Sequence, residues 1–88
     1  MTIIKYGEGK FQRVGVVIGE YEHTVHGRCK MVRTPYNYVT GQQFDNVPVD
    51  KAQPATWEEL MSHAEQVRHE CDCKIEAFLD MASAEVFA

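Results

Sequence analysis

The sequence lacks the features that mark secreted and membrane proteins. Its 88 residues contain no apolar run near the roughly 18 residues that a membrane-spanning helix requires. The first residues contain no charged region followed by an apolar stretch, so no secretory signal peptide is expected. The three cysteines, Cys29, Cys71 and Cys73, are an odd and sparse set that does not suit a disulfide framework. We therefore expect a cytoplasmic protein without membrane contact.

Motifs for catalysis and for nucleotide binding are also absent. The chain has no nucleophile elbow and no dinucleotide fingerprint, and residues 7–10 lack the length and the Ser or Thr of a phosphate loop. Zinc requires four nitrogen or sulfur ligands, which only residues 23–29 and 69–73 could supply. His69 and Cys73 share a helix face, but no Cys-x-x-Cys pair occurs. We expect no enzymatic activity, no cofactor and no bound metal.

What the chain does contain is typical of one small globular domain spanning residues 1–88, with 44% hydrophobic and 25% charged residues. The net charge of −4 is unevenly distributed. Residues 1–40 hold six basic and three acidic side chains, a net charge of +3, whereas residues 41–88 hold three basic and ten acidic ones, a net charge of −7. This asymmetry is the most informative feature of the composition.

The N-terminal half, residues 1–49, is rich in β-branched and aromatic residues and predicts strands separated by Gly and Pro. Consecutive Val16, Val17 and Ile18 indicate burial on both faces of a strand, and Gly15 and Gly19 indicate a bulge or bend. A two-residue turn at residues 26–27 would place Glu20 opposite Arg33. We predict an antiparallel β-meander of three to five strands, either open or curled into a small barrel.

After a connector at residues 50–55, one long amphipathic helix is predicted over residues 56–85. Thr56 is a good N-cap, and Glu59 completes a capping box. A helix of about 28 residues would be ~42 Å long, whereas a domain of this size is only ~30 Å across. The helix therefore overhangs its sheet or breaks, with Asp72 the favoured place. Its apolar stripe is formed by Trp57, Leu60, Met61, Ala64, Val67, Cys71, Ile75, Phe78, Leu79, Ala82 and Val86.

Two binding functions follow from this α+β arrangement. Basic and aromatic residues of the β half suit single-stranded nucleic acid, held by phosphate contacts and base stacking. The helix suits a protein partner, because its apolar face can dock and its acidic face can meet a basic surface. The nucleic-acid candidates are Lys10, Arg13, Arg28, Lys30, Arg33, Tyr36 and Tyr38, and the protein-binding candidates are Trp57, Leu60, Glu65, Glu76, Phe78 and Asp80.

We favour the protein-binding function. The sequence predicts a non-enzymatic interaction protein that forms a homodimer or acts as a small regulator or stoichiometric inhibitor of a larger protein. A target that normally binds nucleic acid would suit the acidic helix face. The short, acidic and motif-free character is typical of regulators carried by phages and mobile elements. The alternative is a small β-barrel that binds single-stranded nucleic acid.

Overall fold

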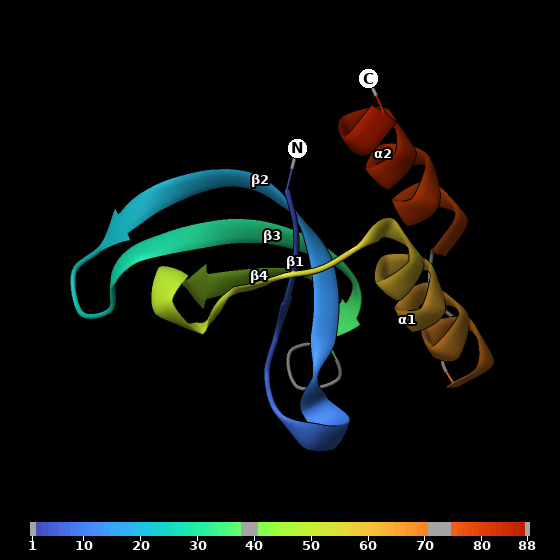
Figure 1. The fold of residues 1–88 in the computed structure, drawn as a ribbon, viewed down its shortest axis with the longest axis horizontal. Coiled ribbons are helices and arrows are strands. Elements are labelled where there is room, and N and C mark those ends of the chain that lie inside the picture. The colour runs from blue at the N-terminus through green and yellow to red at the C-terminus, as the bar shows by residue number, and fades with distance from the viewer. Residues whose placement is uncertain (1, 38–40, 71–74, 88) are drawn as a thin grey trace.

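The computed structural model describes residues 2–37, 41–70 and 75–87, and it shows a strongly curved antiparallel sheet with both helices on one side (Figure 1). The sheet has five strands in the order β4-β3-β2-β1-β5. The predicted α+β meander is confirmed, but the strands do not close into a barrel, because β4 and β5 remain the two edges. The elements are β1 (Ile3–Tyr6), η1 (Gly9–Phe11), β2 (Arg13–His23), β3 (Gly27–Asn37), β4 (Gln42–Pro48), η2 (Val49–Lys51), β5 (Gln53–Pro54), α1 (Trp57–Glu70) and α2 (Ile75–Phe87).

The predicted connector is therefore not without structure. Residues 50–55 contain the end of η2 and the short strand β5, which pairs with Ile4 and Lys5 of β1. Ala55 N–H donates to the Ile3 carbonyl at 2.9 Å. These contacts carry the chain along β1 to the start of α1, so they set where the helices begin relative to the sheet.

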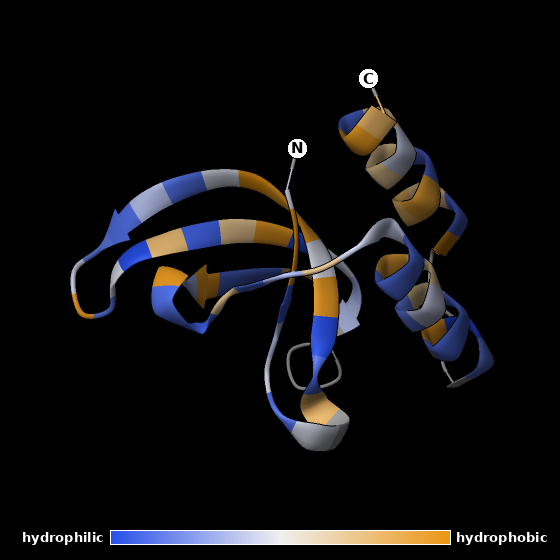
Figure 2. Cartoon of the chain, viewed as in Figure 1, coloured by the Kyte–Doolittle hydropathy of each residue, from blue (hydrophilic) through white to orange (hydrophobic). Residues whose placement is uncertain are grey.

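β2 is buried on both of its faces where it passes beneath the helices. Val16 packs with the helices, while Val17 packs with Ile4, Val32 and Val47 on the opposite, concave face of the sheet. Figure 2 shows this apolar stretch of β2 giving way to polar residues as the strand leaves the helices. The predicted burial on two faces is confirmed for Val16 and Val17, whereas Ile18 is 39% exposed. The predicted bulge is also present, since the register between β2 and β3 shifts between Val17 and Gly19.

The hairpin joining β2 and β3 has a different register from the predicted one. His23 pairs with Gly27, and Glu20 pairs with Lys30 instead of Arg33. The cause is a three-residue turn at residues 24–26, in which His23 Nδ1 accepts the N–H groups of Val25 and His26 at 3.1 and 3.2 Å. Gly27 has a φ of 72°, a conformation that glycine adopts at little cost. The His23 side chain therefore stabilises a turn at residues 24–26 instead of the predicted turn at residues 26–27.

The prediction of one continuous helix was wrong, because α1 and α2 are separate and run in opposite directions (Figure 1). The physical reason is length. A single helix over these residues would be ~42 Å long, and the longest dimension of the folded chain is 36 Å. Two shorter helices bring both apolar faces onto one sheet. Asp72, the predicted break point, lies outside the described residues, and among those described no helix is long and apolar enough to cross a membrane.

The start of α1 is confirmed at the predicted capping box. Glu59 N–H donates to Thr56 Oγ1 at 3.1 Å, and Thr56 N–H donates to Glu59 Oε1 at 3.3 Å. The described part of the predicted apolar stripe divides into side chains buried against the sheet and half-buried side chains at its margin. Its fully buried members are Leu60, Ala64, Val67, Ile75, Phe78 and Ala82.

Candidate protein-binding surface

The two helices contact each other at both ends of their shared border. At one end the rings of Trp57 and Phe87 meet edge to face, with centroids 4.7 Å apart. At the other end Arg68 Nη2 lies 2.7 Å from Glu76 Oε1. Because α1 and α2 run in opposite directions, the first residue of α1 meets the last of α2, and a residue near the end of α1 meets one near the start of α2. These two contacts identify which flank of each helix faces the other helix.

Helical geometry shows which further residues share that border. At about 100° per residue, Met61, Glu65 and Glu58 lie within about 100° of Trp57 on α1. On α2, Leu79, Val86, Phe87, Glu76 and Asp80 lie within about 120° of one another. Phe87 is 65% exposed, and the other four apolar side chains are half-buried. We define the helix surface as the apolar group Trp57, Met61, Leu79, Val86 and Phe87 with the surrounding acids Glu58, Glu65, Glu76 and Asp80.

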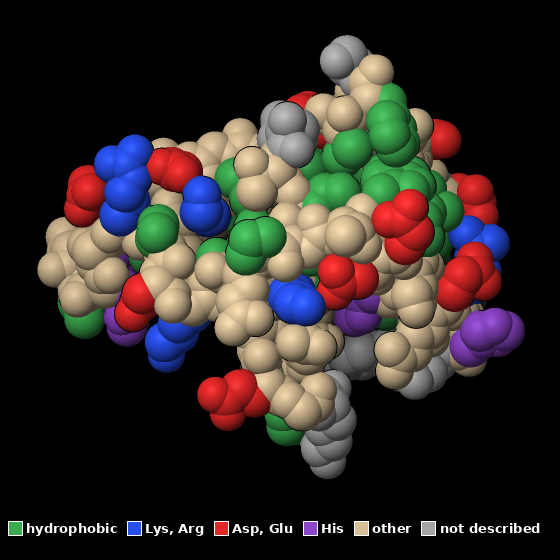
Figure 3. Space-filling model, viewed as in Figure 1, with side chains coloured by type: hydrophobic (Ala, Val, Ile, Leu, Met, Phe, Trp, Pro, Cys, Tyr) green, Lys and Arg blue, Asp and Glu red, His purple; other side chains and the backbone are tan. Residues whose placement is uncertain are grey.

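A space-filling view shows a broad apolar area over the two helices with acidic side chains around it (Figure 3). Arg68 is the basic residue at this border, and it pairs with Glu65 at 3.7 Å and with Glu76 at 2.7 Å. Glu58 and Asp80 are exposed and form no ion pair with the described part of the chain. The helix surface therefore holds four acids against one base, with two carboxylates unneutralised.

The predicted protein-binding residues divide into two groups. Trp57, Glu65, Glu76 and Asp80 lie on the helix surface. Leu60 and Phe78 are 0% and 1% exposed and pack against the sheet, so they stabilise the core and cannot contact a partner while the protein is folded. Leu60 and Phe78 were predicted as binding residues because periodicity alone does not separate the centre of a buried face from its margin.

Phe87 is the member of the helix surface that sequence reasoning missed. It lies outside the apolar stripe and beyond the predicted helix end at residue 85, whereas α2 continues to Phe87. Its position depends on the reversal of chain direction between α1 and α2, which places it on Trp57. No local pattern in the sequence signals that contact.

The structure does not gather the predicted nucleic-acid-binding cations into one free cluster. Arg13 Nε lies 3.2 Å from Asp45 Oδ2, and its guanidinium carbon lies 5.3 Å from the centre of the Tyr6 ring. Arg28 and Lys30 both bind the Glu20 carboxylate, at 2.7 and 2.8 Å. These ion pairs, with Lys30 the larger contributor, lower the pKa of Glu20 below its usual range.

The remaining nucleic-acid candidates are dispersed. Arg33 is half-buried opposite Val16 and Phe44 in the sheet, and Tyr36 packs against the cluster under α1 and α2. The side chain of Lys10 and the whole of Tyr38 lie outside what the structure describes. The aromatic and basic residues therefore do not form one stacking surface in the described chain.

Tyr6 forms a buried polar centre on the concave face of the sheet. Its hydroxyl makes no hydrogen bond to the residues described, and the neighbouring Thr34 hydroxyl donates to the Val14 carbonyl at 2.9 Å. Burial, with a smaller contribution from the Asp45 carboxylate, raises the pKa of Tyr6 well above its usual range. Tyr6 therefore stays neutral at physiological pH.

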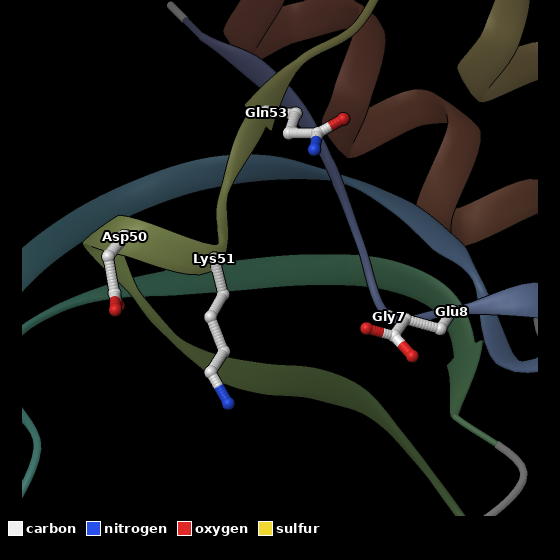
Figure 4. Close-up of a pocket in the computed structure, with 5 residues that line it drawn as sticks. All are labelled: Gly7, Glu8, Asp50, Lys51 and Gln53. Atoms are coloured by element: carbon white, nitrogen blue, oxygen red, sulfur yellow. The ribbon is translucent and has the colours of Figure 1, made fainter.

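A hollow of about 430 Å³ lies between the end of β1 and η2, lined by Gly7, Glu8, Asp50, Lys51 and Gln53 (Figure 4). Its charged side chains are of mixed sign, and all five residues are exposed. This lining provides no buried group that would select a ligand. In the described ranges no three His, Cys, Asp or Glu side chains are placed to hold a metal ion, and the predicted pair His69–Cys73 lies partly outside them.

Comparison with known proteins adds no assignment: no protein-family model, no curated protein and no solved structure matches this chain.

Proposed function

We propose that this protein acts without catalysis, by binding another protein through the helix surface, and that it serves as a small regulator or stoichiometric inhibitor of that partner. The observation that carries the proposal is the exposed ring of Phe87, which packs edge to face on the half-buried Trp57 within an apolar area bordered by acids. Exposed aromatic side chains at the centre of an apolar patch are typical anchors of protein interfaces.

Energetic considerations support this role. Phe87 is 65% exposed although it packs on Trp57, so much of its apolar surface stays in contact with water. A partner that covers it would gain the hydrophobic contribution of that area at about 25 cal/mol per Å². Glu58 and Asp80 flank the area and supply charge for orientation.

The test compares two exposed phenylalanines. Immobilised protein captures partners from an extract of the source cells, and bound proteins are quantified by mass spectrometry. Phe87→Glu should reduce capture of one partner at least tenfold, in line with the loss of an interface anchor. Phe11→Glu is the matched control, because Phe11 is 54% exposed in η1, outside the helix surface. Circular dichroism verifies that both variants fold.

The regulatory part of the proposal has its own measurement. The captured partner's activity should change in proportion to added protein and saturate at a fixed ratio, while Phe87→Glu should have little effect. Equal capture by wild type and by both variants would contradict binding through the helix surface. Turnover of any substrate by the protein alone would contradict the non-enzymatic role.

A further inference from the structure

We infer that the partner presents a cationic amphipathic segment to the helix surface, and that the occupant is not a second copy of this chain. This inference rests on the function proposed above and specifies the chemistry of the partner. It follows from where the structure leaves charges paired and where it leaves them free.

A face-to-face dimer through the helix surface is disfavoured by charge. Each copy would bring Glu58, Glu65, Glu76 and Asp80 against the same acids of the other, with Arg68 already shared between Glu65 and Glu76. Like charges placed together across an interface oppose association. The apolar centre favours association, but the acidic border requires a partner of opposite sign.

A head-to-tail contact between copies is disfavoured because four cations of the β half are already engaged. Lys5 pairs with Glu59 at 3.2 Å, Arg13 with Asp45 at 3.2 Å, and both Arg28 and Lys30 with Glu20. The net charge of +3 of residues 1–40 therefore offers little free positive charge to the acidic helices of another molecule.

Pairing between copies along the edge of β4 is also hindered. The Asn46 N–H donates to Asp45 Oδ1 of its own strand at 3.2 Å, and Pro48 has no N–H to offer. Proline and charged side chains at an edge strand oppose the addition of another strand. The β4 edge is therefore a poor contact between copies.

The shape of the helix surface suits an amphipathic helix. Its apolar centre lies along the border of two helices that run in opposite directions, from the Trp57–Phe87 contact to the Arg68–Glu76 pair. The twelve residues from Trp57 to Arg68 extend over about 16 Å of helix. An amphipathic helix can place its apolar side chains along this border and its Lys or Arg side chains over the surrounding acids.

Trp57 gives a direct readout, because it is the single tryptophan of the chain and lies on the helix surface. The probe is a synthetic 14-residue helical peptide with Leu on one face and Lys on the other. Its control carries Glu in place of Lys. The Leu/Lys peptide should shift the Trp57 emission to shorter wavelength with 1:1 saturation, and its affinity should fall with added salt. The Leu/Glu peptide should leave the emission unchanged.

Two variants with the same change in net charge distinguish binding at the helix surface from a general effect of the protein's negative charge. Glu58→Gln with Asp80→Gln removes the two unpaired carboxylates and should weaken binding of the Leu/Lys peptide about tenfold. Glu8→Gln with Glu85→Gln makes the same change in net charge at exposed positions elsewhere, and it should weaken binding less than twofold. Equal weakening by both, or equally tight binding of both peptides, would overturn the inference.

Light scattering tests whether a second copy of the chain binds to the helix surface. A dimer that forms with increasing concentration and dissociates in Phe87→Glu would identify a second copy on the helix surface and contradict the inference. If the Leu/Lys peptide does not bind but capture of a cellular partner depends on Phe87, the proposed function stands and the cationic chemistry is wrong. If neither peptide binding nor capture of a cellular partner depends on Phe87, both the inference and the proposed function are wrong.

Discussion

The β half and the helical half of this protein handle charge in opposite ways. In the sheet, Arg13 of β2 pairs with a carboxylate of β4, and Arg28 and Lys30 of β3 pair with a carboxylate of the neighbouring β2. In the helices, Glu58 and Asp80 have no such partner among the described residues. The net charges of residues 1–40 and 41–88, which are +3 and −7, therefore do not describe the charge that is available at the surface of each half.

The difference has a geometric cause. Antiparallel strands bring together side chains that are far apart in sequence, so an arginine at position 13 can pair with an aspartate at position 45. Within one helix, pairing reaches only side chains three or four residues away, and Arg68 is the only Lys or Arg of the described helices. Arg13, Arg28 and Lys30 of the sheet therefore act within the fold. Glu59, Glu65 and Glu76 of the helices are also paired, whereas Glu58 and Asp80 remain available to a partner.

The largest expected effect distinguishes the two sides of α2. Phe78→Ala should lower the free energy of unfolding by about 3–5 kcal/mol, because Phe78 is 1% exposed and its removal leaves a cavity. Phe87→Ala should cost less than about 1 kcal/mol, because most of that ring is already in water. Urea denaturation followed by circular dichroism measures both. Equal losses would mean that the ring of Phe87 belongs to the core.

The second prediction tests whether charge pairs in the sheet are part of the fold. Asp45→Ala should cost about 2 kcal/mol, because it leaves Arg13 unpaired, with both side chains less than 20% exposed in the native pair. Asp80→Ala, at an exposed helical position without an ion pair, should change stability by less than about 0.5 kcal/mol. Urea midpoints compare them, and similar values would remove the contrast between the halves.

The third prediction concerns the start of the helical half. Thr56→Ala should cost about 1 kcal/mol, because it removes the side-chain oxygen that accepts the Glu59 N–H at 3.1 Å. Thr56→Ser keeps that acceptor and should retain most of the stability. Thermal unfolding by circular dichroism provides the measurement. A serine variant as unstable as the alanine variant would show that the cap is not the cause.

The fourth prediction addresses the buried hydroxyl groups of the sheet. Tyr6→Phe should leave stability unchanged or raise it by up to about 1 kcal/mol, because it removes a buried group without a hydrogen bond to the described residues. Thr34→Val should lower stability by about 1 kcal/mol, because the Thr34 hydroxyl donates to the Val14 carbonyl. A clear loss from Tyr6→Phe would reveal a partner, such as a bound water, for that hydroxyl.

The smallest expected effect is a pH dependence from two exposed carboxylates. Chiefly Lys5 lowers the pKa of Glu59, and chiefly Lys30 lowers that of Glu20. A lowered native pKa gives stability that is present above the ordinary value of 4.5 and is lost as the pH falls through the native pKa. Urea midpoints should therefore decline on acidification below about pH 4.5, and less so in a Glu59→Gln variant. An unchanged decline in that variant would exclude Glu59 as a source.

Local features of the sequence predicted local structure well. The capping box located the start of α1, and consecutive valines predicted burial on both faces of β2. Each of these depends on residues only a few positions apart, so physical rules for caps and strand faces suffice. The predicted register of the β2–β3 hairpin was wrong, because the His23 side chain stabilises a turn that glycine placement alone did not favour.

The end of the first helix could not be located from the sequence for a related reason. No Gly or Pro follows residue 56, so local propensity permits a helix that is longer than the folded domain. Covering one sheet with both apolar faces requires the chain to reverse direction, which is a property of the whole domain. The placement of Phe87 on Trp57 follows from that reversal and was missed with it.

The sequence by itself determined that this protein joins a β-meander to an amphipathic helical segment with an acidic outer face. Apolar periodicity, a capping box and charge content each depend only on residues that are close together in the sequence. The tertiary structure alone decided which of those residues form a binding surface. It buried Leu60 and Phe78 and paired Arg13, Arg28 and Lys30 of the sheet with carboxylates. It also left Phe87 exposed on the half-buried Trp57, beside acids that form no ion pair with the described residues. The reason is that burial and ion pairing depend on which distant segments of the chain come into contact. The limited area of the sheet determines those contacts.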